Sequence, residues 1–312
     1  MSSFYSALGL HYLCSIDEYY IVEGGKDMGD RIYPIGIQNF EKIRKEGYVY
    51  VDKTALMYKL VKSGSYYFLS RPRRFGKSLL ISTLEAYFEA KRDLFEGLAV
   101  ETLEKDWVKR PVLHLDLNIG KYDTPDSLDK ILDSSLSKWE ELYGTGVAES
   151  TLALRFAGVV ERAYEQSGER VAILIDEYET MDGCIKFALL TGVTKFGKVS
   201  VFSDLNNLND ISMDEPFISI CGITEKEIHL NFEEDLHELA AAQKMTYQEV
   251  CNELKVCYDG YHFTENTDGI YNPFSLLNTF FKMKFGNYWF ETGTPTYLVE
   301  LLKRNHYNLE RM

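Results

Sequence analysis

The 312-residue sequence predicts an α/β fold with a mostly parallel sheet covered by helices, followed by a smaller C-terminal helical domain. The first observation is a series of short apolar runs, such as Val171 to Ile175, that alternate with stretches of helical periodicity. Apolar strands that alternate with helices are typical of a parallel sheet covered on both faces. The second observation is the composition. With 45% hydrophobic and 26% charged residues, the chain is globular rather than disordered or fibrous.

The charge and the cysteines exclude several classes of protein. The formal net charge of −14 argues against general adhesion to nucleic acid or to an anionic membrane. The five cysteines are odd in number and form no C-x-x-C pair, so neither a zinc ribbon nor a disulfide framework is expected. The aliphatic runs reach about five residues, far short of the roughly 20 that span a bilayer, and the N-terminus lacks the basic residues of a signal peptide. We expect a cytoplasmic protein without a membrane partner.

Each expected element follows from the spacing of its apolar residues. Short apolar runs predict strands at residues 66–69, 112–117, 171–175, 187–191 and 217–221. Apolar residues at every third or fourth position predict helices at residues 53–61, 78–90, 127–142, 151–167, 233–242 and 247–257. Asp52 precedes the first of these helices and is its expected N-cap. Together these elements predict an N-terminal extension (1–32), a sheet-containing core (33–224) and a helical, lid-like domain (225–312).

The strongest local signal for function is the stretch S-R-P-R-R-F-G-K-S at residues 70–78, which follows a strand and opens a helix. This is the context of a P-loop. Gly76 would let the backbone approach a triphosphate, Lys77 would reach its β- and γ-phosphates, and Ser78 would place its hydroxyl on Mg²⁺. The usual pattern has a first glycine where this chain has Arg71, so the alternative of a basic strand–helix turn stays open. The nucleotide-binding residues expected from the loop are Arg73, Arg74, Phe75, Gly76, Lys77, Ser78 and Leu79.

The apolar strand at 171–175 ends in two acids, Asp176 and Glu177, which are the second signal. Paired carboxylates at the end of a buried strand are costly to desolvate unless a counter-ion accompanies them. In a Walker B role, Asp176 would hold Mg²⁺ through water and Glu177 would polarise the attacking water. The alternative is a solvated strand end that leads into an acidic loop. Lys77 and Asp176 are 99 residues apart, which suits the class of P-loop proteins that inserts a strand between the two motif strands.

The end of the next strand, L-L-T-G-V-T-K at residues 189–195, is a third candidate. A polar residue at this position can contact the γ-phosphate or the attacking water. Thr191 and Thr194 are the expected residues, and Lys195 is a weaker candidate. An ordinary strand-ending turn explains the same residues about as well. The expected catalytic set is Glu177, Lys77 and Thr191.

Several separated motifs resemble the AAA-ATPase-like family of predicted bacterial ATPases. They are P-I-G-I-Q-N-F at 34–40, Y-V-D-K-T at 50–54, residues 68–78, 174–178 and 191–196, N-N-L at 206–208, Y-D-G-Y-H at 258–262 and Y-N-P-F at 271–274. The resemblance covers about residues 33–312 and implies an ATP-binding P-loop domain of the AAA-like branch. Arg71 is part of the family's pattern. The family often carries a C-terminal nuclease-like domain of the PD-(D/E)xK type, before which this chain apparently stops.

The chain departs from the family after Glu177. Only about seven residues, 178–184, connect this acid to the next strand, where the family has a longer helical insert. We expect no crossover helix there: either a tight extended return, or a following strand that is shifted or antiparallel. The N-terminal stretch S-F-Y-S-A-L at residues 3–8 resembles the helix that ends the family's insert, through rearrangement or by chance. If it is rearranged, Phe4 and Leu8 would shield the uncovered face of the sheet.

Three functions remain open on this basis. The first is a Mg²⁺-dependent ATPase whose hydrolysis moves the domain at 225–312. The second is a nucleotide-binding regulatory module with little turnover, because the short connection lies beside Glu177. The third is a P-loop kinase for a small molecule. The double acid favours hydrolysis over phosphotransfer, and no separate acceptor motif is visible. The expected ligands are ATP and Mg²⁺, and the sequence names no protein partner.

Overall fold

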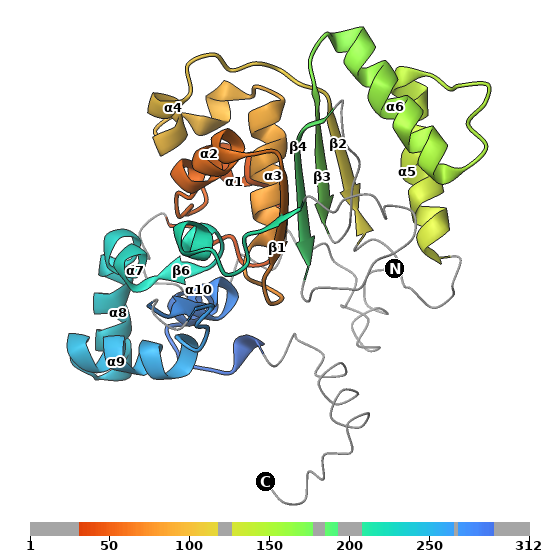
Figure 1. Cartoon of the computed structure of the whole chain (residues 1–312). Helices are drawn as coiled ribbons and strands as arrows, with labels where there is room; N and C mark the ends of the chain where they lie inside the picture. Colours follow the sequence, from red (N-terminus) through yellow and green to blue (C-terminus); the bar gives the residue numbers. More distant parts are fainter. Residues whose placement is uncertain (1–30, 118–126, 177–184, 193–207, 265–267, 290–312) are drawn as a thin grey trace, which may run out of the picture. The chain divides into compact units, whose positions relative to one another are not determined.

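A parallel sheet is the centre of the fold (Figure 1). The computed structural model describes residues 31–117, 127–176, 185–192, 208–264 and 268–289. The chain forms two compact units, Met1–Ile32 and Tyr33–Met312, and the second holds every element named below. The described strands of the sheet run in the order β2–β3–β4–β1–β5, and each neighbouring pair is parallel. Their bounds are β1 Tyr66–Ser70, β2 Val112–Asp116, β3 Val171–Asp176, β4 Ile185–Gly192 and β5 Asn209–Asp210.

The predicted α/β class is therefore confirmed, and β4 lies between β1 and β3, the strands that carry the two motifs. The helices that accompany the sheet are α1 Phe40–Lys45, α2 Thr54–Ser63, α3 Lys77–Phe88, α4 Ala99–Leu103, α5 Ser127–Tyr143 and α6 Leu152–Ser167. The C-terminal helices are α7 Glu225–Asn231, α8 Glu233–Gln243, α9 Tyr247–Tyr258 and α10 Pro273–Lys282. The helices expected at 78–90, 127–142, 151–167, 233–242 and 247–257 are all present within a few residues.

Each face of the sheet has its own hydrophobic core. Alternate residues of one strand point to opposite faces, so Leu174 and Leu189 pack with α2 and α3, whereas Ile173 and Leu190 pack with α5 and α6. Every residue of β3 is buried. This explains why its first five residues are continuously apolar rather than alternating, as is typical of parallel strands covered on both faces.

A third core joins the C-terminal helices. Phe232 and Phe280 stack with their ring centroids 5.1 Å apart, and Leu236, Leu254 and Tyr33 belong to the same cluster. Two capping boxes, Thr224 with Glu227 and Thr246 with Glu249, begin α7 and α9. A short antiparallel pair, β6 Ile223–Thr224 and β7 Ile270–Tyr271, connects this group of helices back to the segment that follows the sheet.

Two sequence-based expectations about local structure are wrong. Residues 217–221 are not a strand, because Glu215–Ile220 forms a 3-10 helix with Pro216 in its first turn, and β5 occupies the sheet edge beside β1. An apolar run of this length does not by itself distinguish a strand from a buried helical turn. The N-cap of α2 is Lys53 rather than Asp52. The Asp52 carboxylate still accepts a hydrogen bond from the Thr54 N–H at 2.8 Å.

Strand β4 is parallel to β3, with Ile185 opposite Val171 and Thr191 opposite Asp176. The antiparallel alternative is therefore wrong. Eight residues link the two strands in the sequence, and a fully extended chain of that length reaches about 30 Å. This reach exceeds the roughly 20 Å length of β3, so a parallel β4 is compatible with so short a connection. The connection itself, with Glu177, lies outside the described residues, as does the N-terminal segment around Phe4 and Leu8.

The described helices give no candidate for a membrane span, since none of them combines the length and the apolar character that a bilayer crossing needs. Within the same part of the chain, Cys221, Cys251 and Cys257 are free thiols.

Candidate nucleotide-binding site

The phosphate loop at residues 70–78 connects β1 to α3. Helix α3 begins at Lys77, and its N-cap, Gly76, has a left-handed backbone with φ 93°. Arg74 is also left-handed, with φ 67°. A residue other than glycine adopts this conformation at a cost of about 1–2 kcal/mol. Residue 71 is not left-handed, which is why Arg71 can occupy a position where other P-loops have glycine. The first N–H groups of α3 have no partner within the helix, so its N-terminus favours an anion.

Lys77 lies at the inner side of the loop and is 8% exposed. Its ammonium group donates to the carbonyl oxygens of Arg71 at 2.9 Å and Pro72 at 3.3 Å. An ammonium group has three N–H donors, and a phosphate oxygen, which carries negative charge, is a stronger acceptor for it than a neutral carbonyl. The loop carbonyls therefore hold the ammonium group at the start of α3, beside the N–H groups that favour an anion.

Asp176, at the end of β3, connects the start of α3 to strand β4. The hydroxyl of Ser78 donates to Asp176 Oδ2 at 2.5 Å, and the hydroxyl of Thr191 donates to Asp176 Oδ1. Asp176 is 3% exposed and Thr191 is fully buried. Ser78 and Asp176, which are 98 residues apart in the sequence, thus meet at the carboxyl ends of β1, β3 and β4. Thr191 fixes the carboxylate of Asp176, a contact that the sequence analysis did not foresee.

The oxygen atoms of Ser78 and Asp176 are suitable ligands for a magnesium ion. Mg²⁺ prefers oxygen ligands, keeps several waters, and uses one or two carboxylates together with substrate phosphates. Because the Ser78 hydroxyl donates its hydrogen bond to Asp176, the lone pairs of the Ser78 oxygen remain available to a cation. In the residues that the structure describes, no three His, Cys, Asp or Glu side chains gather into a metal-binding group. The donors on the protein therefore suit an ion whose shell is completed by phosphate and water.

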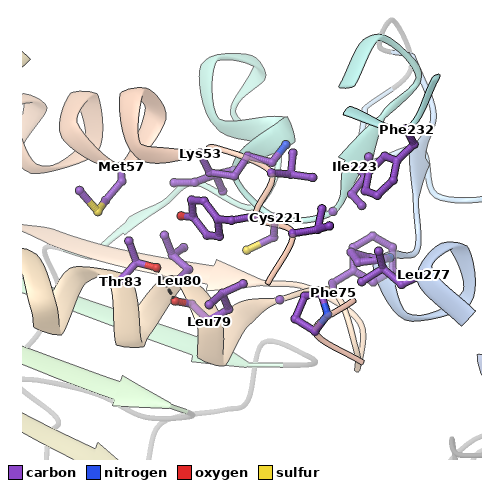
Figure 2. A pocket seen from close by; sticks show the side chains of 18 residues that line it. Lys53, Met57, Phe75, Leu79, Leu80, Thr83, Cys221, Ile223, Phe232 and Leu277 are labelled. Atoms are coloured by element: carbon purple, nitrogen blue, oxygen red, sulfur yellow. Dashed lines mark hydrogen bonds between the residues drawn. The ribbon is translucent and has the colours of Figure 1, made fainter. Parts of the chain in front are cut away.

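A mainly apolar cavity of about 100 Å³ lies next to the phosphate loop (Figure 2). Leu79, Leu80 and Gly76 line it from the loop and α3, and Ile223, Phe232 and Leu277 line it from the C-terminal elements. The cavity is thus formed jointly by the loop with α3 and by elements that follow the sheet in the sequence.

Polar groups are few in this cavity. The ammonium group of Lys53 pairs with Glu227 on α7 at 2.5 Å. Burial lowers the pKa of Lys53, and the charge of Glu227 opposes that effect. Burial also raises the pKa of the Cys221 thiol, which keeps this group protonated and neutral at physiological pH.

Aromatic residues from the C-terminal part hold the loop on its outer side. Phe75 is fully buried, packs edge-to-face on Tyr261 with ring centroids 4.6 Å apart, and accepts a hydrogen bond from Gly222 N–H at 3.0 Å. The guanidinium of Arg74 lies 4.8 Å from the centroid of Phe274. The Trp289 indole donates to the carbonyl of Arg73 at 3.1 Å. The motifs Y-D-G-Y-H and Y-N-P-F thus supply packing partners for the loop.

The structure brings together most of the predicted site residues. Gly76, Lys77, Ser78 and Asp176 converge, with Thr191 behind Asp176. Phe75 is an anchor whose ring points into protein, and Arg73 and Arg74 are exposed. Glu177, Thr194 and Lys195 lie outside the described residues. The sequence analysis assigned no role to Arg71, to Lys53 with Glu227, or to the C-terminal aromatic residues, because each depends on contacts between distant segments.

Comparisons with known proteins agree with this geometry. The family model described as "Predicted AAA-ATPase" matches residues 34–182. An "Uncharacterized protein in vnfD 5'region" of Azotobacter chroococcum mcd 1 is 39% identical over 305 residues, which cover 88% of this chain and 57% of that protein. The chain therefore spans a little over half the length of this relative. No solved structure matches the chain. With its parallel sheet and phosphate loop, the chain has a P-loop NTPase fold, and its resemblance to the AAA-ATPase-like family is confirmed over residues 34–182.

Proposed function

We propose that this chain binds Mg²⁺–ATP at the phosphate loop and hydrolyses it. The observation that carries the proposal is the hydrogen bond from Ser78 to Asp176. It joins the start of α3 to the end of β3, beside a left-handed Gly76 and the Lys77 ammonium group. This arrangement can hold a triphosphate through backbone N–H groups, one lysine and one divalent cation. The match to predicted AAA-ATPases supports the same conclusion.

The cavity beside Gly76 and Leu79 is the proposed site of the adenine base, because its apolar lining suits a flat heterocycle. Its volume of about 100 Å³ is smaller than the roughly 300 Å³ at which typical ligand sites begin. We therefore expect the C-terminal side of the cavity, with Phe232 and Leu277, to move outward when the base enters. This movement is the proposed link between nucleotide binding and residues 225–312, acting as a lid on the core at 33–224.

The proposed roles follow from the contacts. Lys77 binds the β- and γ-phosphates, and Arg73 and Arg74 add positive charge at the exposed side of the loop. When bound, Mg²⁺ neutralises charge on the phosphates. Ser78 presents its oxygen to the ion, and Asp176, held by Thr191, orients the ion's waters. The assignment of Glu177 as the residue that polarises the attacking water rests on its position after Asp176 in the sequence.

The experiment is MgATP binding and phosphate release by the purified chain, compared with the Glu177→Gln variant. The variant should keep its ATP affinity and lose turnover, because an amide does not accept a proton as a carboxylate does. A parent chain that binds ATP without releasing phosphate would instead be a regulatory nucleotide-binding module. Transfer of phosphate to an added acceptor would identify a kinase. A folded parent chain with no affinity for MgATP would overturn the proposal.

A further inference from the structure

The guanidinium of Arg71, the first residue after β1, is an unusually buried charge. Arg71 is 1% exposed. One terminal nitrogen donates to the carbonyl oxygens of Ser70 and Ser212, both at 2.8 Å. The other donates to the carbonyl oxygen of Ile218 at 3.1 Å, with a longer contact of 3.4 Å to that of Phe217. The ring of Phe263 covers its face, with its centroid 4.1 Å from the guanidinium carbon.

Stability alone does not explain this arrangement. Among the described residues, Arg71 makes no ion pair with a carboxylate; its acceptors are carbonyl dipoles. Burial lowers the pKa of Arg71, and the smaller electrostatic effect of Asp210 opposes it. A buried charge without a carboxylate partner is costly, and an apolar side chain of similar size commonly replaces such a group without loss of stability.

The backbone of Arg71 connects this buried guanidinium to the proposed phosphate site. Its N–H donates to the carbonyl of Gly192 at the end of β4, at 2.9 Å. Its carbonyl accepts from the Lys77 ammonium group, also at 2.9 Å. One residue therefore fixes the end of β1 against β4 and provides an acceptor for the phosphate-binding lysine. The guanidinium holds that residue against the segment 212–218.

We propose that Arg71 is a positioning residue that holds the Lys77 ammonium group in place, by tying the first residue of the phosphate loop to the segment 212–218. The two terminal nitrogens of its planar guanidinium donate to the carbonyls of Ser212 and Ile218 at the same time, whereas a lysine offers a single ammonium group. In this loop the side chain takes over the fixing role that a tight glycine turn has in other P-loops. The inference rests on the proposed function, because it concerns how the loop binds phosphate.

The test is MgATP affinity measured by calorimetry for Arg71→Lys, with Arg110→Lys as the matched control. Arg110 is also an arginine, but it pairs with Glu169 outside the site. Arg71→Lys should weaken affinity about tenfold or more, as the loss of a charge-assisted hydrogen bond does, whereas Arg110→Lys should leave it unchanged. In a Lys77→Ala background, Arg71→Lys should cause no further loss. A merely structural role would give the same loss in both backgrounds.

The outcomes separate this inference from the proposed function. A parent chain without MgATP affinity overturns both. If the parent binds and Arg71→Lys binds equally well, or loses the same factor with and without Lys77, only the role of Arg71 is wrong. If Arg71→Lys does not fold, Phe263→Leu replaces it, since this change removes the ring that holds the guanidinium against its carbonyl acceptors. It should weaken MgATP affinity in the parent and not in the Lys77→Ala background, and an unchanged affinity in the parent would overturn the inference.

Discussion

Replacing Gly76 by alanine separates the cost to the fold from the cost to the site. Gly76 has φ 93°, and a Cβ built there meets no atom within 4 Å. The substitution therefore costs the folded chain only the added backbone strain, about 1–2 kcal/mol, which in a protein of this size lowers the melting temperature by roughly 2–4 °C. The new methyl group points into open space beside the start of α3. If phosphate occupies that space, the methyl group displaces it from the loop.

Gly97 offers a matched control, because it is also left-handed (φ 77°), its Cβ position is equally open, and it lies in the turn before α4 rather than in the loop. Gly97→Ala should show a similar loss of melting temperature in a thermal scan and no loss of ATP affinity. Gly76→Ala should weaken ATP affinity, measured by calorimetry, by about tenfold or more, the equivalent of one charge-assisted hydrogen bond. Equal ATP affinity in the folded Gly76→Ala variant and the parent would refute the placement of phosphate at this turn.

Two further predictions concern charge near the site. Asp176→Asn should keep the fold but weaken the Mg²⁺ dependence of ATP binding, because an amide is a poorer partner for a hydrated dication; identical magnesium titrations would contradict this role. The second concerns His114, whose pKa is lowered by burial and raised by the hydrogen bond and charge of Glu85, with a net increase. The stabilisation is therefore complete below about pH 6.5 and is lost as the pH rises through the higher folded value. His114→Gln should flatten this decline in the free energy of unfolding, measured by urea titration at several pH values, and an unaltered pH profile would show that the pair does not contribute.

The sequence predicted the sheet and the phosphate loop because their signals are local. Val171 to Ile175 is apolar throughout because both faces of the strand are covered, and the strand–loop–helix order around Lys77 identifies the loop without knowledge of its neighbours. The 3-10 helix at 215–220 was missed because its apolar run has the length of a strand, and only the occupation of the sheet edge by Asn209–Asp210 decides against that assignment.

The contacts that surround the loop could not be predicted in this way. Phe263 and Trp289 contact the loop, although they lie about 190 to 215 positions after it in the sequence. Nothing in their local sequence indicates this contact. Arg71 was treated as an irregularity of the glycine pattern. Its role depends on carbonyl groups that come close only in the folded chain.

The central claim, that residues 70–78 bind the phosphates of ATP, is tested most directly by Lys77→Ala. The measurement is MgATP affinity by calorimetry together with phosphate release, with Lys130→Ala as a control, since Lys130 is an exposed lysine on α5. Removing the ammonium group should lower the affinity by about 10- to 150-fold, the equivalent of about 1.5–3 kcal/mol, and abolish turnover, while thermal scans show a folded chain. Lys130→Ala should match the parent in both assays. A folded Lys77→Ala chain with the parent's ATP affinity and rate of phosphate release would contradict the claim.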